Sequence, residues 1–200
     1  MARWLCCLLF VSLIAACSDP AGPDEVDESS LTFLRFDAAA LPLVTFEGSF
    51  WAVAGRNTEL VLRYQPESGQ HEGERFLEFK VPGNGLLRRP DGRAFANGDS
   101  VQIQVVVDNS GRFLFHFEPA GLLFDPDHPA ELRVEYRRAD PDLNGDGRVD
   151  SEDESFELRL DIWKQERPGL PWNRLGTVRF KDNDEVRAQI TGFTGFAVAS

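Results

Sequence analysis

Apolar and polar residues alternate along most of the chain, and this period of two constrains the fold more than any other feature. The alternation recurs in short runs from residue 31 onward, as in 76–81 (Phe-Leu-Glu-Phe-Lys-Val) and 101–107 (Val-Gln-Ile-Gln-Val-Val-Val). Successive side chains of a β-strand point to opposite faces of its sheet, so such runs predict strands with one buried face. No long stretch shows the 3.6-residue period of a helix.

Clusters of Pro, Gly, Asn and Asp separate these runs, as in 82–85 and 108–111, and such clusters are typical of turns. About eleven short strands at this spacing predict an all-β fold, a two-sheet antiparallel β-sandwich over residues 31–200. We interpret the 16 phenylalanines as filling between the two sheets rather than as an aromatic ligand site. The strands are expected over 31–36, 49–53, 59–64, 76–81, 101–107, 112–117, 131–136, 158–162, 175–180, 185–190 and 193–198.

The first sixteen residues have the pattern of a secretory signal peptide. Arg3 is their only charge, and an apolar run over 5–15 follows it. That run is shorter than the roughly 20 residues that cross a bilayer, and small residues precede the expected cleavage site. The expected cleavage site lies within the segment Ile14-Ala15-Ala16-Cys17, which resembles the bacterial lipobox. The resemblance implies cleavage before Cys17 and acylation of its thiol, which would anchor the protein in a membrane.

The residues that follow Cys17 bear on location and tethering. Ser18 stands where an aspartate would favour retention in the inner membrane of the bacterial envelope, so the lipobox resemblance favours the outer membrane. Residues 17–30 are acidic and contain almost no apolar side chain, which predicts a disordered tether. Cys6, Cys7 and Cys17 are the only cysteines, so we expect the mature domain to contain no disulfide.

The charge of the mature chain argues against two kinds of binding surface. Loss of Arg3 with the signal peptide moves the formal net charge from −12 to −13. Such a balance argues against nucleic acid and against direct adsorption to anionic lipid headgroups. Contact with the membrane is therefore expected through the lipid alone.

The segment 142–153 (Asp-Leu-Asn-Gly-Asp-Gly-Arg-Val-Asp-Ser-Glu-Asp) matches a calcium-binding loop. Calcium takes six to eight oxygen ligands, and such a loop supplies them from positions 1, 3, 5, 7, 9 and 12, with glycine at position 6. Gly147 occupies the sixth position. We expect one structural calcium, because four aspartates and Glu152 would otherwise repel one another. The expected ligands are Asp142, Asn144, Asp146, the carbonyl of Arg148, Asp150 and Asp153.

These twelve residues resemble the EF-hand loop and, more closely, the dockerin-type half, in which the twelfth residue is Asp. The match departs from both families, because a strand rather than a helix is expected before the loop and only 151–157 favours a short helical turn after it. A calcium-stabilised insertion between two strands is therefore expected, not a calcium sensor. The alternative is an acidic surface hairpin that binds no ion.

The residues from about 113 onward resemble the ZU5-type β-sandwich. The resemblance rests on segments 117–124, 129–136 and 172–175, and on the closing run 190–198. It implies a β-sandwich used for protein contacts. Some members of that family cleave themselves at a His-Phe-Ser site, but Gly192-Phe193-Thr194 stands there, so the base is missing and cleavage is not expected.

No catalytic residue stands out. The three histidines, His71, His116 and His128, lack metal-type spacing, and no nucleophile elbow, phosphate loop or dinucleotide motif occurs. We therefore expect a non-enzymatic, membrane-anchored binding or structural module of the bacterial cell envelope, with a protein partner there. The alternative is a carbohydrate-binding or glycosidase-accessory role in which Trp51, Trp163 and Trp172 form a sugar-stacking platform. Packing in the core or at a sheet edge is the default interpretation of these three rings.

Overall fold

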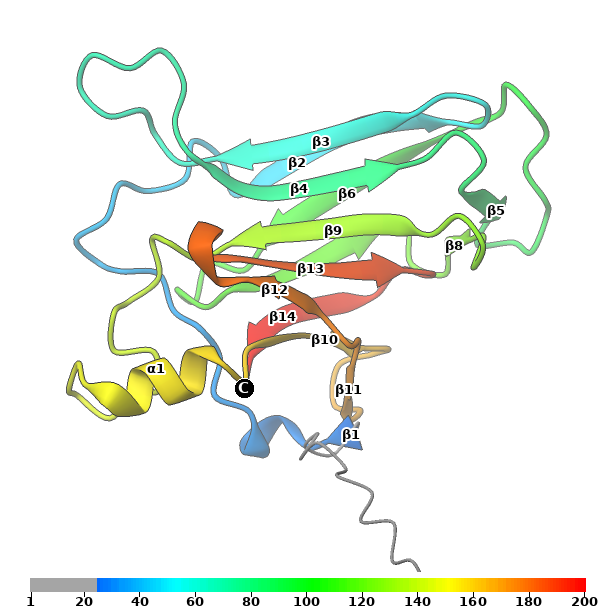
Figure 1. Cartoon of the computed structure of the whole chain (residues 1–200). Coiled ribbons are helices and arrows are strands. Elements are labelled where there is room, and N and C mark those ends of the chain that lie inside the picture. Colours follow the sequence, from blue (N-terminus) through cyan, green and yellow to red (C-terminus); the bar gives the residue numbers. More distant parts are fainter. Residues whose placement is uncertain (1–24) are drawn as a thin grey trace, which may run out of the picture.

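Two open antiparallel sheets face each other in the computed structural model, which describes residues 25–200 (Figure 1). The larger sheet has seven strands in the order β1-β11-β10-β14-β7-β6-β2, and the smaller has five in the order β12-β13-β9-β4-β3. A ribbon of β5 and β8 lies beside them. The all-β, two-sheet antiparallel β-sandwich predicted from the alternation is confirmed. The signal peptide 1–16, Cys17 and residues 18–24 lie outside the described residues.

The strands are short and follow the turn clusters closely, with only one α-helix among the described residues. The helical segments are η1 (Glu28–Ser30), α1 (Ser151–Glu157) and η2 (Lys181–Asn183). None of the helices in 25–200 has the length and apolar character needed to cross a membrane. The strands are β1 (Glu25–Val26), β2 (Glu47–Val53), β3 (Thr58–Arg63), β4 (Arg75–Val81), β5 (Leu86–Arg88), β6 (Ser100–Val107), β7 (Leu114–Glu118), β8 (Leu123–Phe124), β9 (Ala130–Glu135), β10 (Asp161–Gln165), β11 (Trp172–Arg174), β12 (Val178–Phe180), β13 (Glu185–Ile190) and β14 (Gly195–Ala199).

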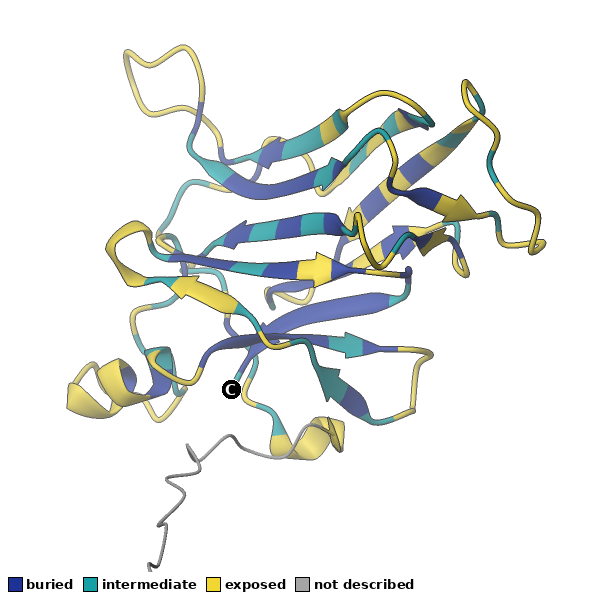
Figure 2. Ribbon diagram, turned by 45° about the vertical axis from the view of Figure 1, so that its right-hand side comes forward, coloured by how far each residue is buried: buried dark blue, intermediate teal, exposed yellow. Residues whose placement is uncertain are grey.

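The main core lies between the two sheets and is rich in phenylalanine. Phe79 of β4 packs tilted against Phe117 of β7 at a centroid distance of 4.8 Å, and Phe193 stacks on Phe117 at 5.0 Å. Buried residues alternate with exposed ones along most of β6 and with half-buried ones along β9 (Figure 2). Aromatic side chains each bury a large apolar area, so this cluster supplies much of the stability of a fold that has no disulfide in its described part.

A second, smaller apolar cluster lies on the outer face of the seven-stranded sheet. Its buried members are Leu114, Trp163, Trp172, Ala197 and Ala199, with Val26, Leu31 and Phe33 packed against them. The last three come from the segment 25–34, which we call the N-terminal strap. This strap covers the part of the sheet formed by β11, β10, β14 and β7, and leaves the part formed by β6 and β2 open.

The ordered chain begins earlier than the sequence predicts. Residues 25–30 were expected to belong to a disordered tether, but β1 pairs with β11 through Glu25–Asn173 and Val26–Trp172. The reason is that Val26, one apolar residue in an acidic segment, packs against Trp172. The tether assignment over 17–30 therefore needs correction at its end, because residues 25–30 belong to the folded part.

Eight of the eleven predicted strands match the observed ones within two residues at each end, and three differ by more. Residues 31–36 form only isolated bridges, because Phe33, Arg35 and Phe36 pair with three different segments. The predicted strand 158–162 becomes β10 from Asp161, since α1 extends to Glu157. The predicted strand 175–180 shortens to β12, because Leu175 and Thr177 bond back to residues Ile162 and Asp161.

Candidate functional site

The acidic loop 142–153 follows β9, ends in the first turn of α1 and is curled around the carboxylate of Asp142. That carboxylate accepts hydrogen bonds from the backbone amides of Gly145 (2.8 Å), Asp146 (3.0 Å) and Gly147 (2.7 Å). Gly145 and Gly147 have φ values of 76° and 88°, which glycine adopts without strain. The glycine at position 6 thus allows the turn for which the sequence predicted it.

Asp153 joins the two ends of this loop. Its carboxylate accepts from the amide of Asn144 at 3.2 Å and from the amide of Asp150 at 2.8 Å, and the residue is buried. The amide of Asp150 and the nearby amides of Asn144 and Leu143 hold the pKa of the Asp153 carboxyl below its usual range, which outweighs the opposing effect of burial. Asp153 is therefore a charged oxygen donor at neutral pH.

Asp150 caps the helix that follows. Its side chain accepts from the amide of Glu152 at 2.8 Å, and with Asp153 it forms a capping box. Phe156 of α1 is buried in the main core, and Tyr136 donates from its hydroxyl to Glu157 Oε1 at 2.9 Å. The helical turn predicted over 151–157 is confirmed, and it attaches the loop to the sandwich.

The donor set of the loop suits calcium in chemical type and in order along the chain, since all its side-chain ligands are oxygens. Asn144 and Asp146 accept from the amides of Asp146 and Arg148, both at 2.9 Å. With the side chains so arranged, no three carboxylate, imidazole or thiol groups within residues 25–200 gather closely enough to hold a metal. The carboxylates of Asp142, Asp146, Asp150 and Asp153 therefore do not form such a group in this arrangement.

The three predicted sugar-stacking rings do not form one platform. Trp163 and Trp172 are buried under the N-terminal strap, and Phe33 packs edge-on against Trp172 at a centroid distance of 5.6 Å. Trp163 donates from Nε1 to the carbonyl of Ala199 at 3.1 Å. Trp51, by contrast, lies on the outer face of β2 and is 59% exposed. The packing interpretation therefore holds for two rings and fails for Trp51.

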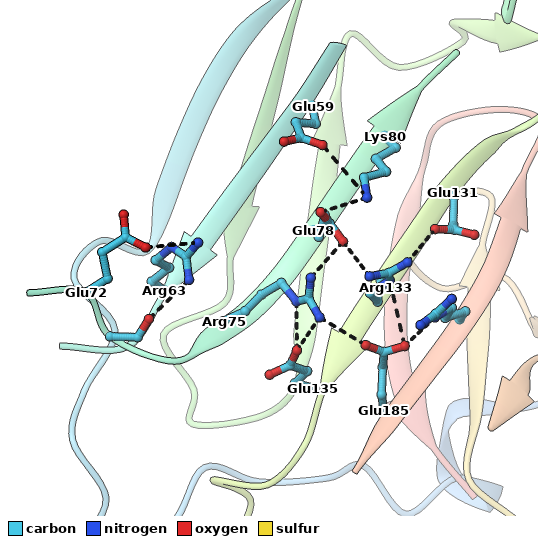
Figure 3. A network of polar contacts seen from close by, with 12 residues as sticks. Glu59, Arg63, Glu72, Arg75, Glu78, Lys80, Glu131, Arg133, Glu135 and Glu185 are labelled. Atoms are coloured by element: carbon cyan, nitrogen blue, oxygen red, sulfur yellow. Dashed lines mark hydrogen bonds and ion pairs between the residues drawn. The ribbon is translucent and has the colours of Figure 1, made fainter. Parts of the chain in front are cut away.

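A lattice of ion pairs covers the outer face of the five-stranded sheet (Figure 3). Arg75 on β4 bonds Glu78 at 3.0 Å and Glu185 of β13 at 3.2 Å, and Arg133 of β9 bonds Glu78 at 3.0 Å. Glu185 also contacts Arg187. The sequence indicated alternating charges on these strands, but not that Glu78 and Glu185 would be buried by their partners.

A hollow of about 550 Å³ lies at the end of this lattice, lined in part by Glu59, Lys80 and Glu131. Lys80 pairs with Glu78 at 3.0 Å, and Glu131 pairs with Arg133 at 3.2 Å. These charged groups are held by one another, and the hollow thus continues the ion-pair lattice of the five-stranded sheet.

The remaining predicted positions are dispersed. His116 is exposed on β7, and Phe193, of the segment compared with a self-cleavage site, is buried in the core. The comparisons with models of known families, with curated proteins and with solved structures found no match for this chain. The resemblances to the ZU5-type domain and to the dockerin half therefore stay predictions.

Proposed function

We propose that this chain is a lipid-anchored, non-enzymatic β-sandwich of the bacterial cell envelope that serves as a binding or structural module. The observation that carries the proposal is the lipobox-like Ile14-Ala15-Ala16-Cys17 at the end of an apolar run. Glu25 of β1, in the part of the chain that the structure describes, lies eight residues after Cys17. The lipid would therefore hold an ordered sandwich close to the membrane, on the outer membrane in our proposal.

We propose a non-enzymatic role because charged side chains of the described residues pair with one another. The acidic and basic side chains of the five-stranded sheet pair with one another, and Asp161 accepts from Arg174 at 2.7 Å and from the amide of Thr177 at 3.0 Å. A catalytic acid or nucleophile needs a free, directed oxygen in a cleft. The charged groups of these clusters instead form ion pairs and hydrogen bonds with one another, which favours a binding or structural module.

The anchor is tested by fractionating cells that express the full chain. We expect the native protein in the outer-membrane fraction and the Cys17→Ser variant released from it, because only an acylated thiol at Cys17 supplies buried methylene groups. Cys7→Ser, a cysteine within the expected signal peptide, is the matched control and should leave the protein in the membrane. Membrane retention of Cys17→Ser would refute the lipid anchor.

Calcium binding by the loop 142–153 is the second part of the proposal. Its support is the order of oxygen donors and the position of Gly147 in a curled loop whose second half caps α1. On binding, the side chains of Asp142, Asn144, Asp146, Asp150 and Asp153 and the carbonyl of Arg148 would turn toward the ion. Calcium would neutralise the acidic cluster and fix the connection between β9 and β10.

Calorimetric titration of chelator-treated protein tests this site. We expect calcium at one hundred times its dissociation constant to stabilise the fold by about 2.7 kcal/mol and to raise Tm by about 5 °C or more. Asp146→Ala should abolish the shift, whereas Asp127→Ala, an acid in a different turn, should preserve it. Equal Tm values with and without calcium in the native protein would disprove a structural ion.

A further inference from the structure

The open part of the seven-stranded sheet carries a patch of uncharged residues around Trp51. Trp51 lies directly opposite Gln102 in the ladder between β2 and β6, and Ser49 lies opposite Gln104. Opposed residues of an antiparallel pair point to the same face, so these four side chains share the outer surface. We call the set Ser49, Trp51, Val53, Ser100, Gln102 and Gln104 the Trp51 face.

The packing of β2 fixes Trp51 in this outward position. Phe50 points into the core, where it packs against Phe79 at a centroid distance of 6.5 Å, and Ala52 is fully buried. Gly48 approaches β3 so closely that a Cβ there would lie 2.9 Å from a methyl carbon of Leu62. A register shift by one residue would bring Trp51 inward and expose these core residues, so the ring stays on the surface.

The Trp51 face differs in charge from the other outer surface of the sandwich. Its six members are uncharged, in a chain of which 27% of the residues are charged. Charged groups of the same outer face lie at the Gln104 end, where Glu118 of β7 is opposite Gln104 and Glu47 lies two residues from Ser49 on β2. The outer face of the five-stranded sheet is instead a lattice of ion pairs, as Figure 3 shows. Among side chains of the Trp51 face, Gln102 Nε2 donates to Ser49 Oγ at 3.3 Å. An exposed ring amid amides and hydroxyls suits a neutral ligand, because the residues next to Trp51 carry no charge that would lose its hydration on binding.

We propose that the Trp51 face is a binding site for a neutral glycan. A pyranose ring has one face of C–H groups, which packs on the apolar surface of an indole, and hydroxyl groups around its edge. Glutamine amides offer donors and an acceptor to such hydroxyls, as serine does on a smaller scale. Trp51 would supply the apolar contact, and Gln102 and Gln104 on the neighbouring strand would hydrogen-bond and orient the sugar.

This inference rests on the proposed function and gives the module a ligand class. β2 and β1 are the opposite edges of the seven-stranded sheet, as Figure 1 shows with β2 near the top and β1 at the bottom. At about 4.8 Å per strand, six intervals separate them by about 29 Å. A lipid attached a few residues before β1 would therefore place the Trp51 face on the side away from the membrane, where a glycan can reach it.

Tryptophan fluorescence tests the site directly, since Trp163 and Trp172 are buried and Trp51 is exposed. The full chain, in a non-ionic detergent without a sugar headgroup, is quenched with acrylamide in the presence of neutral hexasaccharides of glucose, mannose and N-acetylglucosamine. We expect at least one of these sugars to protect the fluorescence of Trp51 against quenching by acrylamide. The Trp51→Phe variant provides the baseline from all other tryptophans.

Variants then separate binding from folding. We expect Trp51→Ala to weaken glycan binding, measured by calorimetry, by about tenfold or more, and Trp51→Phe to weaken it less because a phenyl ring keeps part of the contact. Gln102→Ala should also weaken binding. Val178→Ala, which removes an equally exposed apolar side chain (59%) from β12 of the other sheet, is the control and should bind as the native protein does.

Three outcomes would overturn the inference. They are no protection by any of the hexasaccharides, equal binding by the native protein and Trp51→Ala, and protection by phosphatidylethanolamine vesicles or by polygalacturonate in place of the neutral sugars. Glycan binding is measured on purified protein and does not depend on membrane attachment. A negative result would therefore refute the glycan site but not the lipid anchor, which the Cys17→Ser fractionation tests separately. Release of both native and variant proteins from membranes, with sugar binding intact, would refute the anchor alone.

Discussion

At the scale of single residues, Glu185 shows how this fold tolerates a buried charge. The residue is 1% exposed on the outer face of the five-stranded sheet and contacts Arg75, Arg133 and Arg187. A buried carboxylate loses its hydration and needs such partners in return. Glu185 is thus held by arginine side chains whose apolar stems also shield it from water.

Neutralising Glu185 should destabilise the protein. We expect Glu185→Gln to lower the free energy of unfolding by about 2 kcal/mol, because three partly buried guanidinium groups lose their common acceptor charge. Urea denaturation measures the change. Glu131→Gln, on the neighbouring strand with a side chain 40% exposed, is the control and should cost less than about 1 kcal/mol. Equal stability of the two variants would contradict the central role of Glu185.

The pKa of Glu78 indicates how the stability of the ion-pair lattice changes as the pH falls. Burial alone would raise the pKa of its carboxyl, but the hydrogen bond from Lys80 and the charges of Arg133 and Arg75 hold that pKa below its usual range. A depressed folded-state pKa stabilises the protein above the unfolded-state pKa of about 4.3, and the stabilisation is lost as pH falls through the lower, folded-state value.

The stability difference between native protein and Glu78→Gln should therefore be constant near neutral pH and shrink below about pH 4.3. Urea denaturation at a series of pH values measures it. A difference that grows toward acid would mean that the folded-state pKa of Glu78 is raised, and would contradict this assignment of the lattice charges.

At the scale of elements, the N-terminal strap is the reason why β14 is buried on both of its faces. Phe196 and Val198 point into the main core, while Ala197 and Ala199 belong to the outer cluster under the strap. A strand buried on both faces has a nearly continuous apolar sequence, as 195–199 does. The strap is held by backbone bonds, with the amide of Leu34 donating to the carbonyl of Val198 at 3.0 Å.

Removal of Phe33 should open this outer cluster. We expect Phe33→Ala to shift the tryptophan emission to longer wavelength, because Trp172 loses its edge-on neighbour, and to cost about 2 kcal/mol of unfolding free energy, since the ring is only partly buried. Phe180→Ala is the matched control. Both rings lie under an arginine, at 4.9 Å for Phe33 and 4.1 Å for Phe180. An unchanged emission spectrum in Phe33→Ala would contradict the covering role of the strap.

At the scale of the whole molecule, the two apolar clusters share strands of the seven-stranded sheet. The seven-stranded sheet contributes one face to the main core and the other to the outer cluster, so neither cluster can open without loss of ladder partners. The sheet also separates the strap at one edge from the exposed Trp51 face at the other.

We expect the two clusters to unfold together. In urea, the emission of Trp163 and Trp172 reports on the outer cluster and far-ultraviolet circular dichroism reports on the sheets. Their transitions should coincide, because β14 belongs to both clusters. A fluorescence transition at clearly lower urea, with the sheet signal intact, would mean that the strap unfolds independently.

The sequence by itself determined the fold class, the turns, the helical turn over 151–157 and the order of oxygen donors in 142–153, because periodicity, glycine positions and capping residues act locally along the chain. The alternation also predicts that Trp51 and Ser49 share one face of their strand, and that Gln102 and Gln104 share one face of theirs. It does not predict that these two strands, β2 and β6, are neighbours in the sheet.

The tertiary structure alone decided which tryptophans are buried, that Val26 extends the sheet, and that Glu185 is enclosed by arginines. Each of these depends on contacts between residues far apart in sequence. Trp51, Trp163 and Trp172 all stand in strand-like runs, and only the strap over one half of the seven-stranded sheet separates the buried pair from the exposed ring. Burial is a property of what covers a face, and alternation along a strand carries no information about the cover.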